Sequence, residues 1–202
     1  MIPTMNLRSL ALAPAFALVF ALPAAAEKIP LNEISRYLNS LKTVVASFSQ
    51  VNPNGSVTPG QVYIRRPGRV RFEYKGDQTL VMASAGSVAV FDKKSNTGAQ
   101  QYPLSKTPLS IILADNVNLG RSGMVIGHSE KKNTTVVTAQ DPAHPEYGNI
   151  QMVFTANPTE LRQWVVTDDK GKRTTVILGE MKKGVSIPAS KFSITAEANR
   201  RR

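Results

Sequence analysis

The sequence predicts a mainly β fold with a few short helices, of the α+β class. From Gly60 onward, short runs rich in β-branched and aromatic residues alternate with turn residues, which is typical of an antiparallel meander. Apolar residues recur at helical spacing in only two places, near residues 33–42 and 108–114. The 202 residues include no cysteine, so stability has to come from an apolar core and not from disulfides.

The first 26 residues have the features of an export signal. Arg8 supplies a positive start, Leu10 to Leu22 form an apolar run, and Ala24 to Ala26 provide a small-residue cleavage site. The apolar run has 13 residues, whereas a membrane-spanning helix needs roughly 20. We therefore expect cleavage before Glu27 and a single domain over residues 27–202.

The positive net charge of the chain indicates that its binding partners are negatively charged. The chain carries a formal charge of +11, and an exported protein does not normally meet nucleic acid. The expected partners are therefore membrane lipids, envelope polymers or an acidic protein. Arg200, Arg201 and Arg202 at the C-terminus predict a solvated basic tail.

The first predicted helix runs from about Glu33 to Lys42, after Asn32 as N-cap. Its apolar residues at helical spacing are Ile34, Tyr37, Leu38, Leu41 and Val45. Beyond it, residues 44–51 could extend the helix or begin a strand, and Ala46 and Phe48 fit a strand.

The β-rich part is predicted to contain eight strands separated by turns. They cover residues 60–66, 70–75, 79–84, 88–92, 132–139, 149–155, 161–167 and 173–180. Tight turns are expected at residues 85–87 and 168–171.

A second short helix, from Pro108 to Ala114, interrupts the strands. Thr107 is a suitable N-cap, and proline is favoured at the first helical position. The apolar face of this helix consists of Leu109, Ile112 and Leu113.

The stretch "YIRRPGRVRFEY", residues 63–74, predicts a hairpin whose register sets the direction of its arginines. A two-residue loop would divide the apolar residues between the two faces of the sheet. A three-residue loop of Pro67, Gly68 and Arg69 gathers them on one face, so this register is favoured. It pairs Arg66 with Val70, Ile64 with Phe72, and Val62 with Tyr74.

In this register Arg66 lies on the apolar face, whereas Arg65, Arg71 and Glu73 face outward. Either the Arg66 side chain extends along its stem into solvent, or it reaches carbonyls, a carboxylate or water at the rim. Arg65 and Arg71 would oppose each other, as part of a solvated face or of a docking surface for an acidic partner.

Two short helices are too small to cover the apolar face of so many strands. The sheet therefore either closes on itself as a compact barrel or keeps a cavity for an apolar ligand. The pattern of residues leaves both possibilities open.

Catalytic and metal-binding patterns are weak. His128 and His144 lack the spacing of metal ligands, and Asp141, His144 and Glu146 lie in a proline-rich loop. The sequence "GRSGM" narrowly misses the G-x-S-x-G nucleophile motif. We predict neither enzymatic activity nor a metal or cofactor.

Several stretches together resemble the periplasmic carriers of outer-membrane lipoproteins (LolA type). The stretches are Ser47-Phe48-Ser49-Gln50, Gly60 through "YIRRPGRVRFEY", Leu80-Val81 with Gly86, Val90-Phe91-Asp92, and Thr107-Pro108-Leu109. The resemblance implies an incomplete antiparallel β-barrel, or half-barrel, covered by a lid of short α-helices that encloses a hydrophobic cavity. It also implies that Arg66, just before the hairpin proline, is a latch that holds the lid closed.

The function that the resemblance implies is lipoprotein transport through the periplasm. The partners would be acylated lipoproteins, an inner-membrane lipoprotein-releasing ABC transporter as donor and an outer-membrane acceptor, with the carrier a monomer. A lipid-binding sensor, or a carrier of another lipid, remains an alternative. We hypothesise that acyl chains contact the following residues, for which plain core packing is the alternative: Val62, Ile64, Val70, Phe72, Leu80, Leu109, Ile112 and Leu113.

Two features depart from the family pattern. Lys75-Gly76-Asp77 replaces a proline that usually follows the Phe-Glu-Tyr strand, and the chain ends soon after Phe192 without the longer extension of enteric members. The means by which such a protein limits backward transfer to the inner membrane is therefore left open.

Overall fold

The computed structural model describes residues 28–76, 79–92 and 98–201. The predicted export signal, Asp77 and Arg202 lie outside these residues. Within the described ranges, no helix is both long and apolar enough to cross a membrane.

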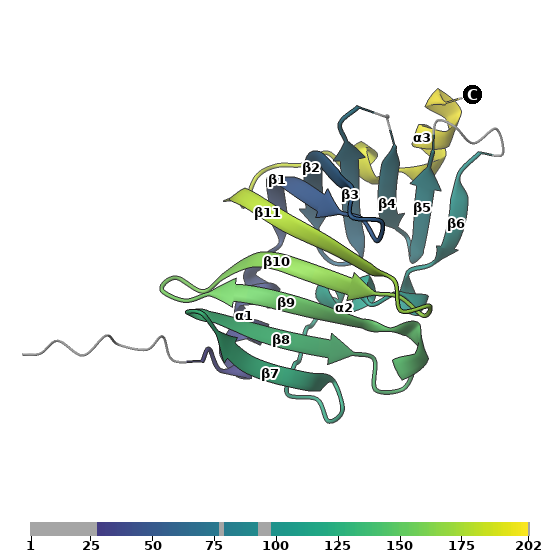
Figure 1. The fold of residues 1–202 in the computed structure, drawn as a ribbon. Coiled ribbons are helices and arrows are strands. Elements are labelled where there is room, and N and C mark those ends of the chain that lie inside the picture. Colours follow the sequence, from purple (N-terminus) through teal and green to yellow (C-terminus); the bar gives the residue numbers. More distant parts are fainter. Residues whose placement is uncertain (1–27, 77–78, 93–97, 202) are drawn as a thin grey trace, which may run out of the picture.

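The architecture is one open antiparallel sheet of eleven strands (Figure 1). Its strand order is β6-β5-β4-β3-β2-β1-β11-β10-β9-β8-β7, so β1 pairs with both β2 and β11, and strands distant in sequence meet at the centre. The strands are β1 (Thr43–Val51), β2 (Val57–Arg65), β3 (Arg69–Tyr74), β4 (Leu80–Ser84), β5 (Ser87–Phe91), β6 (Gln100–Pro103), β7 (Val125–Lys131), β8 (Thr134–Gln140), β9 (Asn149–Thr155), β10 (Glu160–Thr167) and β11 (Arg173–Lys183).

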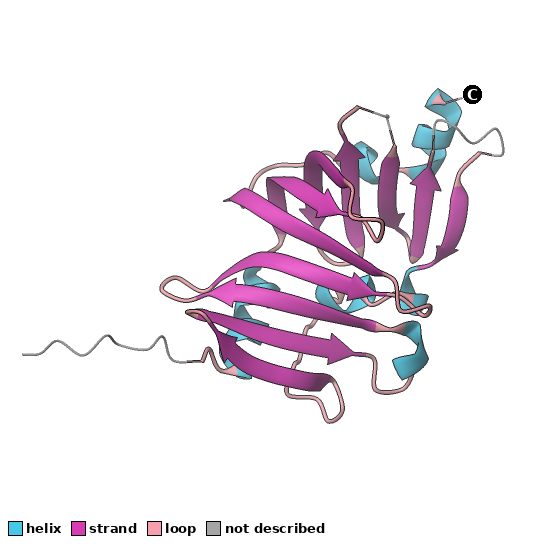
Figure 2. Cartoon of the chain, in the orientation of Figure 1, coloured by secondary structure: helices cyan, strands magenta, loops and turns pink. Residues whose placement is uncertain are grey.

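The helices lie on two sides of this curved sheet (Figure 2). α1 (Leu31–Ser40) and α2 (Leu109–Leu113) pack within the curve, on what we call the inner face. α3 (Ile194–Arg200) packs on the opposite, outer face. Three short 3-10 helices complete the described elements: η1 (Leu104–Lys106), η2 (Pro145–Tyr147) and η3 (Ala189–Phe192).

The predicted mainly β, antiparallel class is confirmed, with differences at particular elements. Residues 44–51 belong to a strand, β1, which leaves α1 shorter than predicted at its C-terminal end. α1 begins after Pro30 and not after Asn32, and α2 begins after Pro108, because each proline already has the fixed φ that suits a helix start. The strands β6 and β7 were not predicted.

The predicted hairpin pairs are wrong by one position on each strand, although the faces are correct. Ile64 pairs with Val70 and Val62 with Phe72, across a three-residue loop of residues 66–68. Because this shift preserves the alternation of faces, Val62, Ile64, Val70 and Phe72 still share the inner face.

Gly60 pairs with Tyr74 and allows aromatic packing beside it. A Cβ atom at Gly60 would collide with the Phe48 ring and the Glu73 carbonyl. The Phe48 ring makes edge-to-face contacts with Phe72 and Tyr74, at centroid separations of 5.4 and 5.2 Å. Phe72 also packs against Trp164 of β10, so aromatic residues join the two halves of the inner core.

The inner face contains the larger of two apolar clusters. Ile34 and Leu38 of α1, and Ile112 and Leu113 of α2, are buried there against the sheet. The smaller cluster lies on the outer face, where Ile194 and Ala198 of α3 pack against four residues of β4 and β5: Leu80, Met82, Ala89 and Phe91.

Arg200 and Arg201 are exposed, as predicted, but they belong to a helix and not to a tail. Arg200 ends α3, and Arg201 is its C-cap. Both side chains pair with Glu197, at 2.7 and 2.8 Å, because α3 folds back onto apolar residues of the sheet.

Candidate functional site

Arg66 lies where α1, α2 and the β2–β3 hairpin meet. Its side chain is on the inner side of the sheet, and the residue is 8% exposed. The guanidinium donates from Nη1 to the Leu38 carbonyl of α1, and from Nη2 to the Ala114 carbonyl just after α2, at 2.5 Å. One side chain of the sheet therefore bridges both inner helices.

The hairpin caps the C-terminal end of α2 with main-chain and side-chain donors. Gly68 N donates to the Leu113 carbonyl at 2.8 Å, next to the bond from Arg66 to Ala114. The last carbonyls of a helix have no partner within it and need donors from elsewhere. The hairpin supplies such donors, which explains why a strand-end arginine turns inward here.

Asn39 connects α1 to the segment that follows α2. Its Oδ1 accepts from Arg66 Nη2 at 3.1 Å and from Val117 N at 2.8 Å. Its Nδ2 donates to the Val117 carbonyl at 2.9 Å and to Asn116 Oδ1 at 3.1 Å. Arg66, Asn39, Ala114 and Val117 thus form one hydrogen-bond network, which we call the Arg66 network.

The partners of Arg66 are neutral groups. Among the described residues, no carboxylate accepts a hydrogen bond from it, and its Nε is buried without a partner. Burial lowers the pKa of Arg66, while the nearby charge of Asp115 acts in the opposite direction. The charge is therefore held by carbonyl dipoles at helix ends, where cations are favoured.

Further bonds fix α1 to the other half of the sheet. Tyr37 OH accepts from Leu161 N at 3.0 Å, and burial raises the pKa of this phenol. Thr159 donates to Glu33. α1 is therefore attached to the sheet at both ends, by the Arg66 network and by the chain around β10.

The structure gathers seven of the eight residues expected to contact acyl chains. Leu109 is partly buried against the inner cluster, whereas the buried members are Val62, Ile64, Val70, Phe72, Ile112 and Leu113. Leu80 is placed apart from them. It pairs with Glu73 on β3 and packs on the outer face, under α3.

The family of the chain follows from a sequence comparison. Residues 39–195 match the family described as outer membrane lipoprotein carrier protein LolA. The chain belongs to this family. The match includes β1 to β11, α2 and Arg66, but begins only at the end of α1.

Two curated relatives of this LolA-family chain are named outer-membrane lipoprotein carrier proteins. The one from Azotobacter vinelandii is 24% identical over 187 residues, which span 87% of this chain and 89% of that protein. The one from Methylococcus capsulatus is 23% identical over 206 residues, spanning 92% and 96%.

Solved structures also show distant similarity to the LolA-family chain. A LolA superfamily protein from Nitrosomonas europaea is 9% identical, with a TM-score of 0.44 over 82% of this chain and 98% of that one. An uncharacterized conserved protein from Thermus thermophilus is 10% identical, with a TM-score of 0.46 over 80% and 89%.

Arg65 and Arg71 do not oppose each other as predicted. Arg65 pairs with Arg69, and Arg71 pairs with Tyr63. Arg71 faces the outer side but is 7% exposed, because η3 and α3 cover it, and it bonds to Glu73 and Glu197. The Arg71 part of the predicted solvated or docking face is therefore wrong.

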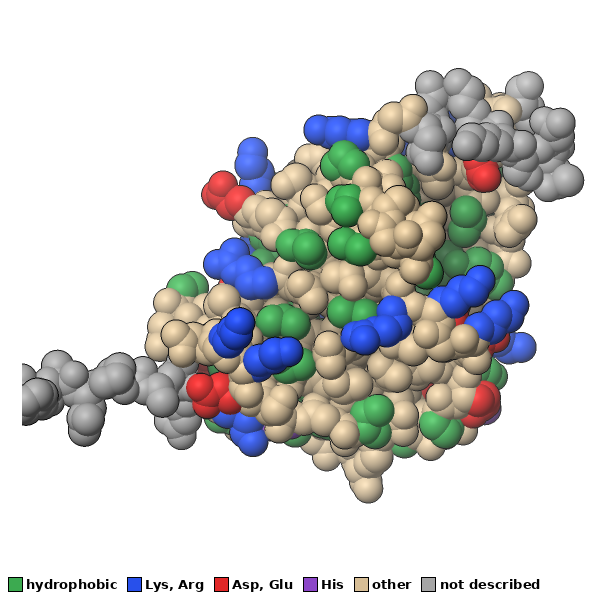
Figure 3. All heavy atoms as spheres, in the orientation of Figure 1, with side chains coloured by type: hydrophobic (Ala, Val, Ile, Leu, Met, Phe, Trp, Pro, Cys, Tyr) green, Lys and Arg blue, Asp and Glu red, His purple; other side chains and the backbone are tan. Residues whose placement is uncertain are grey.

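Exposed cations do lie elsewhere on the outer face of this LolA-family protein. Figure 3 shows Lys and Arg side chains scattered over the strands that face the viewer. Arg162 pairs with Glu160 at 2.7 Å, and so does Lys183 at 2.9 Å, although Lys183 also lies over the ring of Tyr37 on α1, at the rim of the inner face.

The residues considered for catalysis remain dispersed. His128 donates from Nε2 to the Ile29 carbonyl at 3.0 Å, whereas His144 pairs with Glu146 on an exposed loop. In the described part of the chain, no cluster of three or more His, Cys, Asp or Glu could hold a metal ion.

The sequence interpretation missed Asn39 and Glu197. Asn39 lies at the end of a predicted helix, but its partners are 77 and 78 residues away in sequence. Glu197 was passed over because the residues around it were interpreted as a tail. Its spacing to Arg200 and Arg201, three and four residues on, is the helical ion-pair pattern that could have indicated α3.

Proposed function

We propose that the protein is a periplasmic carrier that shields the acyl chains of lipoproteins in transit. It receives them from an inner-membrane lipoprotein-releasing ABC transporter and delivers them to an outer-membrane acceptor, as a monomer without metal or cofactor. The first 26 residues are removed on export, and residues 27–202 act as one domain. Membership of the LolA family and the names of the curated relatives support this proposal.

The observation that carries the proposal is the bridge from Arg66 to α1 and α2. We propose that these helices form a lid over the inner face and that the Arg66 network is its latch. Because both helices present buried apolar residues to the sheet, moving them outward would expose a continuous apolar surface to an acyl chain. The chain would replace the contacts that Ile34, Leu38 and Ile112 make in the closed form.

The energies are consistent with a lid that must be opened. A sixteen-carbon acyl chain has about 14 methylenes, and burial contributes about 0.8 kcal/mol for each, or roughly 11 kcal/mol per chain. Release to an acceptor is feasible only if part of this free energy is offset on binding. Breaking the bonds of the Arg66 network offsets part of it, and their re-formation favours release.

The acyl chains would lie between the lid and seven of the predicted residues. The sheet contributes Val62, Ile64, Val70 and Phe72, and α2 contributes Leu109, Ile112 and Leu113. Leu80 is excluded from this set because it packs on the other side of the sheet. Phe48 and Trp164, which contact Phe72, extend the proposed surface toward β1 and β10.

The test is transfer of a labelled lipoprotein. Spheroplasts that carry it are incubated with the purified protein, and the soluble fraction is separated by size and examined by native mass spectrometry. We expect a soluble one-to-one complex of the protein with the lipoprotein. Absence of release, with the donor transporter shown to be active on its own carrier, would contradict the proposal.

A further inference from the structure

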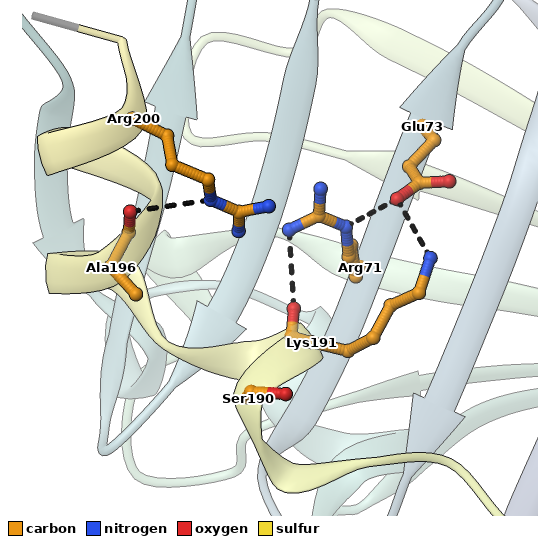
Figure 4. A pocket seen from close by; sticks show the side chains of 6 residues that line it. All are labelled: Arg71, Glu73, Ser190, Lys191, Ala196 and Arg200. Carbon is orange, nitrogen blue, oxygen red and sulfur yellow. Dashed lines mark hydrogen bonds and ion pairs between the residues drawn. The ribbon is translucent and has the colours of Figure 1, made fainter.

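A pocket on the outer face lies between β3 and the C-terminal segment (Figure 4). Its volume is about 370 Å³. Its lining residues are Arg71, Glu73, Ser190, Lys191, Ala196 and Arg200. The sheet separates it from the inner face, so it is distinct from the proposed lipid site and independent of the proposed function.

Positively charged side chains converge on this pocket from three elements. Arg71 comes from β3, Lys191 from η3 and Arg200 from the end of α3. Figure 4 shows the guanidinium groups of Arg71 and Arg200 directed toward each other across the gap. Like charges at such positions require compensation by anions.

The carboxylates at the pocket are shared among several cations. Glu73 Oε1 accepts from Arg71 Nε at 2.6 Å and from Lys191 Nζ at 3.1 Å. Glu197 pairs with Arg71 at 3.1 Å, and also with Arg200 and Arg201. Among the described residues that line the pocket, three cations, Arg71, Lys191 and Arg200, face these two carboxylates, which leaves positive charge in excess.

The excess positive charge lowers the pKa values of both carboxylates. Burial acts to raise the pKa of Glu73 and of Glu197, but the hydrogen bonds from their cationic neighbours outweigh it, and each pKa lies below its ordinary value. Donors also remain available: among the described residues, Nη2 of Arg71 and the Ser190 hydroxyl have no acceptor within hydrogen-bond distance.

We propose that this pocket binds a phosphate group, either of a small soluble molecule or of a phospholipid headgroup. Planar guanidinium groups match the oxygen geometry of phosphate, and a lysine and a hydroxyl add further donors. A phosphate carries between one and two negative charges near neutral pH, which offsets the excess positive charge of the cluster. The pocket is also large enough to admit a glyceryl group attached to the phosphate.

The experiment is a calorimetric titration of the purified protein with inorganic phosphate and with glycerol phosphate at low ionic strength. The test variant is Lys191→Gln/Arg200→Gln, which changes two partly exposed side chains and leaves the buried Arg71 in place. The control is Arg162→Gln/Lys183→Gln, which makes the same change in net charge at the Glu160 ion pairs. Thermal unfolding establishes that each variant is folded.

We expect saturable phosphate binding that weakens at least about tenfold in the test variant and is unchanged in the control. Sedimentation with vesicles containing phosphatidylglycerol, compared with pure phosphatidylcholine vesicles, then distinguishes the sources. Selective vesicle binding that requires Lys191 and Arg200 identifies a headgroup, whereas phosphate binding without it identifies a soluble ligand. No saturable binding, or equal weakening in both variants, would overturn the proposal.

Discussion

Arg66 and Arg71 are five positions apart in one hairpin, and they are buried to almost the same extent, at 8% and 7% exposed. Arg66 faces inward and bonds to neutral carbonyls and an amide, whereas Arg71 faces outward and bonds to two carboxylates. An arginine held by neutral groups can exchange them for water without leaving an opposite charge buried. An arginine held by buried carboxylates cannot. The inner contact therefore suits a part that opens, and the outer contact suits one that stays closed.

The largest expected effect is the destabilisation caused by Arg71→Leu. Glu73 and Glu197 would each lose the hydrogen bond from Arg71 but keep other cationic partners, so the expected cost is that of lost hydrogen bonds to charged groups, about 1.5–3 kcal/mol. We expect the free energy of unfolding, measured by urea denaturation, to fall by about that amount. Arg69→Leu is the control. Arg69 lies on β3, as Arg71 does, but its side chain donates no hydrogen bond to any described residue. Equal losses in the two variants would remove the distinction between the arginines.

Arg66→Leu is expected to impair delivery more than stability. The variant leaves no charge behind, and it still accepts lipoprotein because the inner face remains apolar. Without bonds to re-form on closure, delivery to the acceptor should slow by about tenfold, as expected for the loss of one to two charge-assisted hydrogen bonds. A transfer assay from preloaded complex measures this rate.

Arg65→Leu provides the matched control for that assay. Arg65 is adjacent in sequence, but it points to the other side of the sheet, and its one acceptor among the described residues is the Ile187 carbonyl, at 3.2 Å. It should deliver at the wild-type rate. Delivery by Arg66→Leu that is as fast as by Arg65→Leu would show that Arg66 is not a latch.

Asn39→Asp should make Arg66 resemble Arg71. The new carboxylate can still accept from Arg66 Nη2 and Val117 N, although it loses the two bonds that the Asn39 amide donates to Val117 and Asn116. The new ion pair with Arg66 is expected to outweigh these neutral bonds, because charge-assisted hydrogen bonds are roughly twice as strong. We expect loading with lipoprotein to slow by several-fold, because the closed form is stabilised. Asn116→Asp, which changes a residue that does not contact Arg66, is the control. Faster loading in Asn39→Asp than in wild type would contradict this expectation.

Mild acid should loosen the outer helix before the inner ones. The pKa values of Glu73 and Glu197 are lowered in the folded protein, so their stabilisation is present above the unfolded value of about 4.3 and is lost as the pH falls through the folded values. The cations that face them are Arg71, Lys191, Arg200 and Arg201. Amide hydrogen exchange, corrected for its intrinsic pH dependence, should rise in α3 relative to α1 below about pH 4.5. A uniform rise would count against the charge cluster.

The inner face was largely predictable from the sequence, because its residues follow the period of a half-buried strand. Val62 and Ile64 alternate with polar residues, as do Val70 and Phe72. The hairpin could therefore be assigned to faces, although each predicted partner was two positions away from the observed one. The inward turn of Arg66 followed from the same alternation. Its partners did not, because they come from helix ends distant in sequence.

The outer face was not predicted, although the sequence carries a signal for it. "LVMAS" in β4 and "SVAVF" in β5 are almost continuously apolar, which is typical of strands covered on both faces. The polar sequence of α3 gave no matching apolar stripe beyond Ile194 and Ala198. Leu80 was consequently assigned to the wrong face, and Arg71 was interpreted as solvated.

The most direct test of the central claim is to hold the closed form shut. The chain has no cysteine, so Glu33→Cys/Thr159→Cys introduces one thiol on α1 and one just before β10, at two side chains that are hydrogen-bonded to each other. A short cleavable bis-thiol linker then joins α1 to the sheet, and loading from spheroplasts is measured before and after cleavage. If outward movement of the lid admits the acyl chains, the linked protein takes up no lipoprotein and cleavage restores uptake. Equal uptake by linked and cleaved protein would contradict the account.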